Sequence, residues 1–166
     1  MHRSTVQQNR GSALYTAEER RRRDATIWTL VQGVLAPVQF LIFAASLALV
    51  LRYLATGAGE GWATGSIVLK TLVLYTIMIT GAIWEKVVFG RYLFAPAFFW
   101  EDMVSMVVIA LHTLYLTILI MGIGTVEQRM LVALAAYATY AVNAAQFVWK
   151  LRMARLGAAA GLEMAR

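Results

Sequence analysis

The sequence predicts an all-α polytopic membrane protein, in which four transmembrane helices pack as a compact bundle. Three observations lead to this fold class. Of the 166 residues, 60% are hydrophobic and only 14% are charged, whereas soluble domains carry roughly a quarter of charged residues. Four apolar runs reach the length of about 20 residues that crosses a bilayer as a helix. Basic residues gather at the ends of these runs.

The four expected spans cover residues 29–54, 66–88, 103–122 and 130–149. They divide the chain into a polar, basic N-terminal tail (1–27), a transmembrane domain (28–152) and a C-terminal tail (153–166). The first span is not a cleavable signal peptide, because its apolar run is too long and a long polar tail precedes it. Within that tail, Thr16 followed by Glu19 has the pattern of a capping box, which predicts a short surface helix.

The distribution of lysine and arginine predicts the orientation of the bundle. Basic residues precede the first span, lie between the second and third spans, and follow the fourth, whereas the opposite ends carry only Arg52 and Arg129. Both termini and the segment 84–102 are therefore expected on the cytoplasmic side. The net charge of +6 reflects this arrangement and suits anionic lipid headgroups, so no nucleic-acid partner is expected.

Several classes of site are excluded by what the sequence lacks. It contains no cysteine, so disulfides, thiolate metal sites and a cysteine nucleophile are impossible. It contains no HExxH, GxGxxG, P-loop or GxSxG motif, and we expect no metal site of its own. His2 is far from His112 in the sequence, which argues against haem held between paired histidines.

Polar residues inside a span need an explanation, because they are costly in a bilayer. Pro37 is expected to kink the first span, with Gln32 and Gln39 placed to bond freed backbone groups or a neighbouring helix. Lys70 lies near the outer end of the second span, where snorkelling to the headgroups is the favoured explanation. The alternative is a functional charge within the bundle.

The third and fourth spans each carry a polar stripe. On a helix that starts near Glu101, one face collects Ser105, Val108, His112 and Tyr115. His112 would then lie near the middle of the membrane, where it either bonds another helix or contacts a ligand. The fourth span should turn its polar side chains to the bundle interior, namely Tyr137, Tyr140, Asn143, Gln146 and Trp149.

Carboxylates stand at both ends of the segment 84–102, and helix dipoles separate their roles. Glu101 and Asp102 begin the third span, whose positive end favours the ionised form. Glu85 lies at the negative end of the second span, where burial also favours the protonated form, so it is the better general acid. Alternatively, Glu85 forms an interfacial ion pair with Lys86 or Arg91, and the other two carboxylates only cap a helix.

The segment between these carboxylates is rich in aromatic residues and is broken by Gly90 and Pro96, so we expect a connection that lies on the surface or re-enters the membrane. It would shelter a hydrophobic substrate beside polar groups. Trp84, Tyr92 and Trp100 are equally explained as an interfacial aromatic belt.

Five stretches of the chain resemble one family, that of the 3-vinyl bacteriochlorophyllide hydratases of phototrophic bacteria. The resemblance runs from about Tyr15 to Arg155 and is carried by YTAEERRRRD (15–24), WTLVQGVLAPVQF (28–40), SIVLKTLVLYTIM (66–78), WEKVVFGRYLFAPAFFWED (84–102) and LAAYATYAVNAAQFVWKLR (134–152). It implies that the domain 28–152 adds water to the vinyl group of a chlorophyllide or bacteriochlorophyllide, giving a 1-hydroxyethyl group. It also implies a multi-pass protein of the bacterial inner membrane.

We combine this implied reaction with the residues above as a hypothesis. Glu85 protonates the terminal vinyl carbon, and Glu101 or Asp102 stabilises the resulting cation or takes a proton from the attacking water. The other expected substrate-binding residues are Lys86 or Arg91 for the propionate, His112 as an axial ligand to the substrate magnesium or as a polar wall, and Tyr140, Asn143, Trp84 and Trp100 around the macrocycle. No cofactor is needed, because the substrate carries its own magnesium.

Two other functions stay open at this point. A non-enzymatic tetrapyrrole-binding or pigment-assembly protein would explain the aromatic residues and His112, but would not need several interfacial carboxylates. A small transporter would use Lys70 and Glu85 as a charge pathway. A homo-oligomer and contacts with other enzymes of pigment synthesis are both compatible with the sequence.

Overall fold

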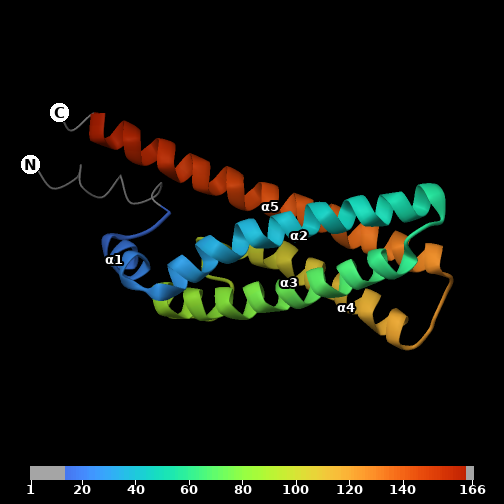
Figure 1. Ribbon diagram of the computed structural model, residues 1–166. Coiled ribbons are helices and arrows are strands. Elements are labelled where there is room, and N and C mark those ends of the chain that lie inside the picture. Colours follow the sequence, from blue (N-terminus) through green and yellow to red (C-terminus); the bar gives the residue numbers. More distant parts are fainter. Residues whose placement is uncertain (1–13, 164–166) are drawn as a thin grey trace, which may run out of the picture.

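The computed structural model describes residues 14–163, and the side chains of residues 14–156. Over this range all regular secondary structure is helical, and short connections join the helices (Figure 1). The helices are α1 (Ala17–Ala25), α2 (Ile27–Thr56), α3 (Glu60–Phe89), α4 (Phe99–Ile120) and α5 (Val126–Glu163). The predicted fold class is confirmed.

Helices α2 to α5 are each long and apolar enough to cross a membrane, as the four apolar runs predicted. Helices α2, α3 and α5 extend past the expected span at both ends, whereas α4 begins earlier than expected and ends at Ile120, two residues short of the expected end. Helix α5 continues to Glu163, so the expected C-terminal tail from residue 153 begins inside a helix. Most of the expected N-terminal tail, residues 1–13, lies outside the described part of the chain.

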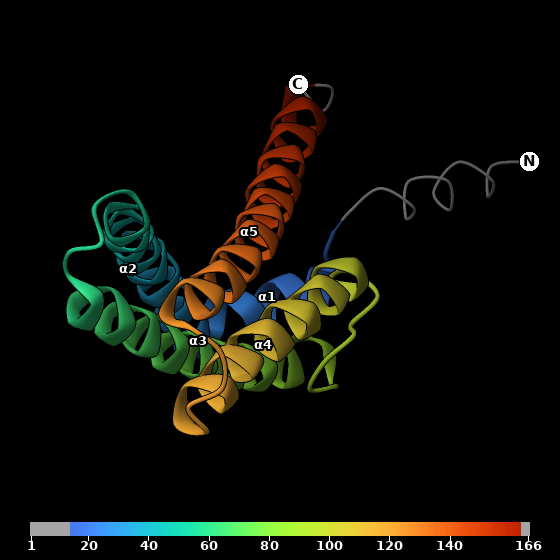
Figure 2. The same cartoon turned by 90° about the vertical axis from the view of Figure 1, so that its right-hand side faces the viewer.

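The four long helices form two antiparallel pairs (Figure 2). Helix α2 packs mainly on α3 and α4 mainly on α5, while α2–α5 and α3–α4 contacts join the pairs less extensively. The aromatic centre of the bundle lies where the pairs meet. There the ring of Phe43 lies 5.4 Å from that of Tyr137 and 4.8 Å from that of Tyr140.

Helix α1 is docked against α3. Its capping box is present as predicted: the backbone N–H of Glu19 donates to Thr16 Oγ1 (3.2 Å), and the N–H of Thr16 donates to the Glu19 carboxylate (2.8 Å). Tyr15, just before the cap, is buried and stacks on Phe89, with ring centroids 5.8 Å apart. Burial raises the pKa of its hydroxyl above the ordinary value of 10.0, an effect that Arg23 opposes.

Side-chain hydrogen bonds tie the first half of α2 to α3. Gln32 Nε2 donates to Thr80 Oγ1 (2.8 Å), and Trp84 Nε1 donates to Thr29 Oγ1 (2.9 Å). The expectation that Gln32 bonds a neighbouring helix is confirmed. Gln39, two residues after Pro37, is buried and neither its amide nitrogen nor its oxygen has a described partner.

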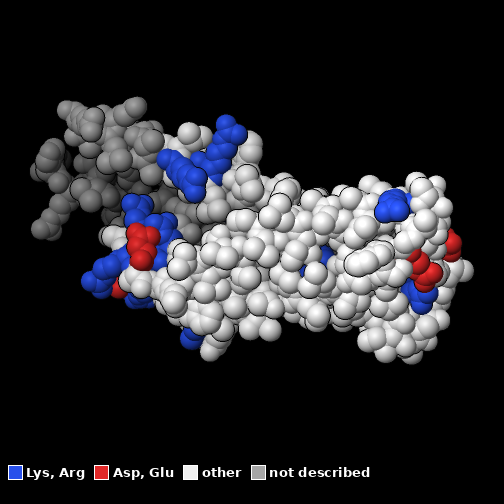
Figure 3. Space-filling view, in the orientation of Figure 1, with Lys and Arg blue, Asp and Glu red and all other residues white. Residues whose placement is uncertain are grey.

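Charged residues lie mainly at the two ends of the bundle (Figure 3). Lysine and arginine gather over α1 and the C-terminal part of α5, and a smaller mixed group of both signs covers the opposite end. We call the first of these the α1 end; it also contains the connection between α3 and α4, residues 90–98.

Gly90 ends α3 in the left-handed conformation (φ 82°), and its N–H donates to Lys86 O at 3.1 Å. A Cβ at this position meets no atom within 4 Å, so the cost of adding one is conformational. We therefore expect Gly90→Ala to lower the free energy of unfolding by about 1 kcal/mol, measured as a lower thermal midpoint in detergent. Gly33→Ala is the control, because Gly33 is a helical glycine in equally open space. An unchanged midpoint for Gly90→Ala would contradict the prediction.

Candidate active site

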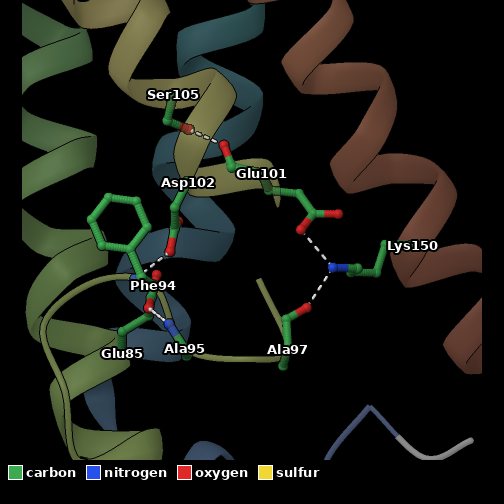
Figure 4. Close-up of polar contacts among 8 residues, drawn as sticks. All are labelled: Glu85, Phe94, Ala95, Ala97, Glu101, Asp102, Ser105 and Lys150. Carbon is green, nitrogen blue, oxygen red and sulfur yellow. Dashed lines mark hydrogen bonds and ion pairs between the residues drawn. The ribbon is translucent and has the colours of Figure 1, made fainter. Parts of the chain in front are cut away.

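Two buried carboxyl groups meet at the α1 end, where α3 ends and α4 begins (Figure 4). Glu85 lies in the last turns of α3 and is 6% exposed, and Asp102 lies in the first turn of α4 and is 4% exposed. The two carboxyl groups lie close enough for the charge of one to affect the protonation of the other. Among the described residues, no lysine or arginine forms an ion pair with either of them.

The connection 90–98 supplies a backbone donor to each member of this carboxyl pair. The N–H of Phe94 donates to Asp102 Oδ2 at 2.7 Å, and the N–H of Ala95 donates to Glu85 Oε2 at 3.2 Å (Figure 4). Phe94 holds a φ of 58°, a left-handed conformation that is uncommon for an aromatic residue. Such strain persists where surrounding contacts impose it, and the Asp102 carboxylate is the contact that holds the Phe94 N–H.

Glu101 is next to Asp102 in the sequence, but its carboxylate forms an ion pair with a lysine and is not part of the carboxyl pair. Its carboxylate lies 2.5 Å from Lys150 Nζ, which also donates to the carbonyl of Ala97. Lys150 therefore ties α5 to both α4 and the connection, and compensates the charge of Glu101. Lys150 is one of the basic residues after the fourth span that were expected only to set orientation, so this role was not predicted. Its position one turn beyond Gln146 of the polar stripe was the available signal.

An aromatic cluster, which we call the aromatic wall, lies at the same end of the bundle as the pair. The ring of Phe98 lies 5.7 Å from that of Trp84, 5.9 Å from that of Phe89 and 5.9 Å from that of Phe147. Trp84 therefore belongs to the aromatic wall. Trp100 is 70% exposed and points away from it, as a residue of the interfacial belt does.

The two basic residues expected to hold a propionate lie at the surface beside the site. Lys86 is exposed and donates to the carbonyl of Gly90 at 2.9 Å. Its ammonium also lies 5.2 Å from the ring centroid of Tyr92. Arg91 follows on the exposed part of the connection. Neither forms an ion pair with Glu85, so the interfacial clamp considered for that residue is not present.

The polar stripes of α4 and α5 face one another inside the bundle. Asn143 Nδ2 donates to Ser105 Oγ (2.7 Å), which donates to the carbonyl of Glu101 (2.8 Å). His112 and Tyr140 are also buried, His112 completely. The inward orientation predicted for these stripes is confirmed for these residues, but it was wrong for Trp149, which is 68% exposed.

Lys70 does not snorkel, and that prediction was wrong. Its side chain is 0% exposed, and Nζ lies over the ring of Tyr140, 3.6 Å from its centroid. Helix α3 turns this position toward α5 instead of toward lipid, and an aromatic face in the interior attracts the ammonium group.

The described residues contain no group of three His, Asp or Glu side chains suited to hold a metal ion. What the site combines is a pair of neighbouring carboxyl groups, fixed by backbone donors, next to an aromatic wall. Two carboxyl groups this close cannot both be ionised at low cost, so the pair is suited to hold and transfer one proton.

Comparison with known proteins decides the family. The sequence model of the family described as 2-vinyl bacteriochlorophyllide hydratase matches residues 15–153. The chain belongs to the 2-vinyl bacteriochlorophyllide hydratase family. The vinyl group carries the number 2 in this name and 3 in the name used above, and both denote the same group.

Two curated relatives in this hydratase family cover nearly the whole chain. A 2-vinyl bacteriochlorophyllide hydratase of Cereibacter sphaeroides is 70% identical over 143 residues, 86% of this chain and 89% of the relative. One of Rhodobacter capsulatus is 68% identical over 147 residues, 89% of this chain and 85% of the relative. No solved structure matches the chain.

The contact between Lys150 and Glu101 gives a prediction for this hydratase-family fold. Lys150→Met leaves the Glu101 carboxylate, 5% exposed, without its cation, and we expect a loss of about 2–3 kcal/mol in the free energy of unfolding. The measurement is thermal unfolding in detergent. Adding Glu101→Gln to Lys150→Met should restore part of the loss, because it removes the uncompensated charge. If the single variant unfolds at the wild-type midpoint, Lys150 does not stabilise the connection.

Proposed function

We propose that the chain adds water to the vinyl group of a bacteriochlorophyllide-type tetrapyrrole, giving a 1-hydroxyethyl group in bacteriochlorophyll biosynthesis. It is then a hydro-lyase, like the relatives whose names state this activity. The structural observation that supports the proposal most directly is the neighbouring pair Glu85 and Asp102. Hydration of an alkene needs a group that gives a proton and a group that accepts one, and the pair supplies both at one place.

Glu85 is the proton donor in this mechanism. Its proton goes to the terminal carbon of the vinyl group, whose π electrons form the new C–H bond. The positive charge then rests on the inner vinyl carbon and is delocalised into the macrocycle. Once Glu85 has lost its proton, both carboxylates of the pair carry negative charge and stabilise this cation, and Asp102 is held as an acceptor by the Phe94 N–H.

Water then forms a bond from its oxygen to the inner carbon, and its surplus proton passes to Asp102. Because Asp102 and Glu85 are neighbouring carboxyl groups that influence each other's protonation, this proton can return to Glu85 without leaving the site. The pair ends each cycle with the single proton it began with. We assign Glu101 to the ion pair with Lys150 and not to this proton transfer.

The aromatic wall of Trp84, Phe89, Phe98 and Phe147 suits the flat apolar macrocycle beside the carboxyl pair. Lys86 and Arg91 lie at the exposed rim, where they are placed to attract the propionate of the substrate. The reaction adds the elements of water and involves no net oxidation or reduction of the substrate. We therefore propose that it needs no cofactor, with magnesium entering only as part of the substrate.

Glu85→Gln tests the proton donor, because it keeps the shape and hydrogen bonding of the side chain but removes the acidic proton. We expect turnover of a vinyl bacteriochlorophyllide by purified protein to fall at least about a hundredfold, with pigment binding little changed. Product is measured by mass spectrometry as the gain of one water, and binding by absorbance titration. Asp102→Asn should also slow turnover, and more strongly than Glu101→Gln.

Glu60→Gln is the matched control, since Glu60 is an exposed carboxylate at the opposite end of the same helix. It should hydrate substrate at the wild-type rate. Near wild-type turnover by Glu85→Gln would show that the proton comes from another group. Binding of pigment without any hydrated product from the wild-type protein would instead favour the non-enzymatic, pigment-binding function.

We further propose that the protein lies in the bacterial inner membrane with its α1 end on the cytoplasmic side. Basic residues dominate this end (Figure 3), and cytoplasmic loops carry the excess of lysine and arginine.

Reporter fusions test this orientation. Fusions to both termini should report the cytoplasm, and an insertion between Gly57 and Gly59, in the connection between α2 and α3, should report the periplasm. A periplasmic signal from either terminus would reverse the assignment and place the carboxyl pair on the outer side.

A further inference from the structure

The carboxyl pair and the aromatic wall are covered by the protein's own side chains. Glu85 and Asp102 are 6% and 4% exposed, and Phe98, at the centre of the wall, is 3% exposed. A substrate as large as a tetrapyrrole cannot touch groups buried to this degree. It reaches them only if an element that covers them moves.

Tyr15, the second residue before α1, covers the aromatic wall at the α1 end. Its ring stacks on that of Phe89, with centroids 5.8 Å apart and 12° between the planes, and lies 6.3 Å from the ring of Phe98. Tyr15 is itself 7% exposed. The ring therefore occupies a flat apolar surface that another flat ring system could use.

This surface adjoins the carboxyl pair. Phe89 follows Glu85 by four residues on α3, and Phe98 precedes Asp102 by four residues, with the Asp102 N–H donating to the carbonyl of Phe98 at 2.9 Å. Each ring is thus one helical turn, or about 6 Å along the helix axis, from a member of the pair. The vinyl group is a substituent on the rim of the macrocycle, so a macrocycle seated on these rings can present it to the pair.

Helix α1 is held loosely compared with the rest of the chain. It packs on α3 at the end of the bundle (Figure 1), and none of its own residues is buried. A single residue, Thr26, separates it from α2, in an extended conformation (φ −91°, ψ 138°). Rotation about this residue moves α1 without changing the packing of α2 to α5.

Contacts within and beside α1 make Tyr15 part of the same unit. The Arg23 guanidinium lies over the Tyr15 ring, 4.8 Å from its centroid, so the ring is linked to the helix that follows it. The Thr29 hydroxyl donates to the carbonyl of Arg23 across the Thr26 hinge at 2.5 Å. This bond holds α1 in the closed position, and rotation of α1 would break it.

We propose that Tyr15 and α1 form a lid over the aromatic wall, and that the substrate macrocycle takes the place of the Tyr15 ring on Phe89 and Phe98. This inference rests on the proposed function, which places the vinyl group at the carboxyl pair. It adds the route of entry, which is from the α1 end, and the surface that binds the macrocycle.

The other elements around the wall are less suited to move. The connection 90–98 holds both members of the pair through the N–H groups of Phe94 and Ala95. Helix α5, which carries Phe147, is tied to α4 and to the connection by Lys150. Moving either element would take the carboxyl pair apart, whereas moving α1 leaves it intact.

Tyr15→Ala tests the competition between the tyrosine ring and the macrocycle. Binding of a vinyl bacteriochlorophyllide, followed by absorbance titration, should become roughly three- to tenfold tighter, because the closed state loses its stacked ring. The thermal midpoint without pigment should fall, because a buried aromatic side chain is lost. A tyrosine with a purely structural role would not lower stability and raise affinity together.

Tyr15→Phe is the matched control, since it keeps the stacked ring and should bind pigment with wild-type affinity. Weaker or unchanged binding by Tyr15→Ala would overturn the proposed competition, and Tyr15 would then be a fixed part of the wall.

Spin labels test the movement of α1 with Tyr15 in place. The chain has no cysteine, so Arg20→Cys on α1 and Val87→Cys on α3, both at exposed positions, give two unique labelling sites. The labels are introduced into Glu85→Gln, which is expected to bind pigment without converting it. Saturating pigment should lengthen the distance between the labels, measured by pulsed electron paramagnetic resonance.

The control pair is Val87→Cys with Arg152→Cys, an exposed position on α5, whose separation should stay the same when pigment binds. An unchanged distance between positions 20 and 87 at saturating pigment would overturn the lid. This failure is distinct from failure of the proposed function, which would appear as pigment binding without hydrated product from the wild-type protein.

Discussion

The two hydrogen bonds from the connection 90–98 to the carboxyl pair are the contacts on which the site depends. The N–H groups of Phe94 and Ala95 donate to Asp102 and Glu85, so one short stretch of backbone positions both carboxyl groups. The left-handed conformation of Phe94 is maintained because its N–H has this partner. The burial of the carboxyl pair and the strained backbone of Phe94 thus belong to the same local geometry.

Lys150 protects this arrangement electrostatically. Three carboxylates lie close together at the α1 end, and all of them are buried. Lys150 compensates Glu101 and binds the carbonyl of Ala97, which leaves Glu85 and Asp102 with each other. An additional cation at the pair would favour the ionised form of both groups. The position of one lysine on α5 therefore separates a structural carboxylate from two that are suited to chemistry.

Both polar regions of the bundle lower its stability, which points to function in each. Among the described residues the carboxyl pair is buried without a cation, and the buried Lys70 ammonium lies over the ring of Tyr140 without a hydrogen-bond partner. Apolar residues at these positions would pack without the cost of removing polar groups from water.

The sequence by itself determined the four spans, the capping box of α1, the buried stripe through Ser105 and His112, and the position of Glu85 and Asp102 at the two ends of the connecting segment. These follow from length, hydropathy and helical period, which are local properties of the chain. Only the tertiary structure decided that Glu101 pairs with Lys150, that Lys70 points inward to Tyr140 and that Trp149 faces outward. Each of these depends on how α5 is rotated and placed against α3 and α4. A periodic pattern places a residue on a face of its own helix, but the neighbour that this face meets is set by packing between helices far apart in the sequence.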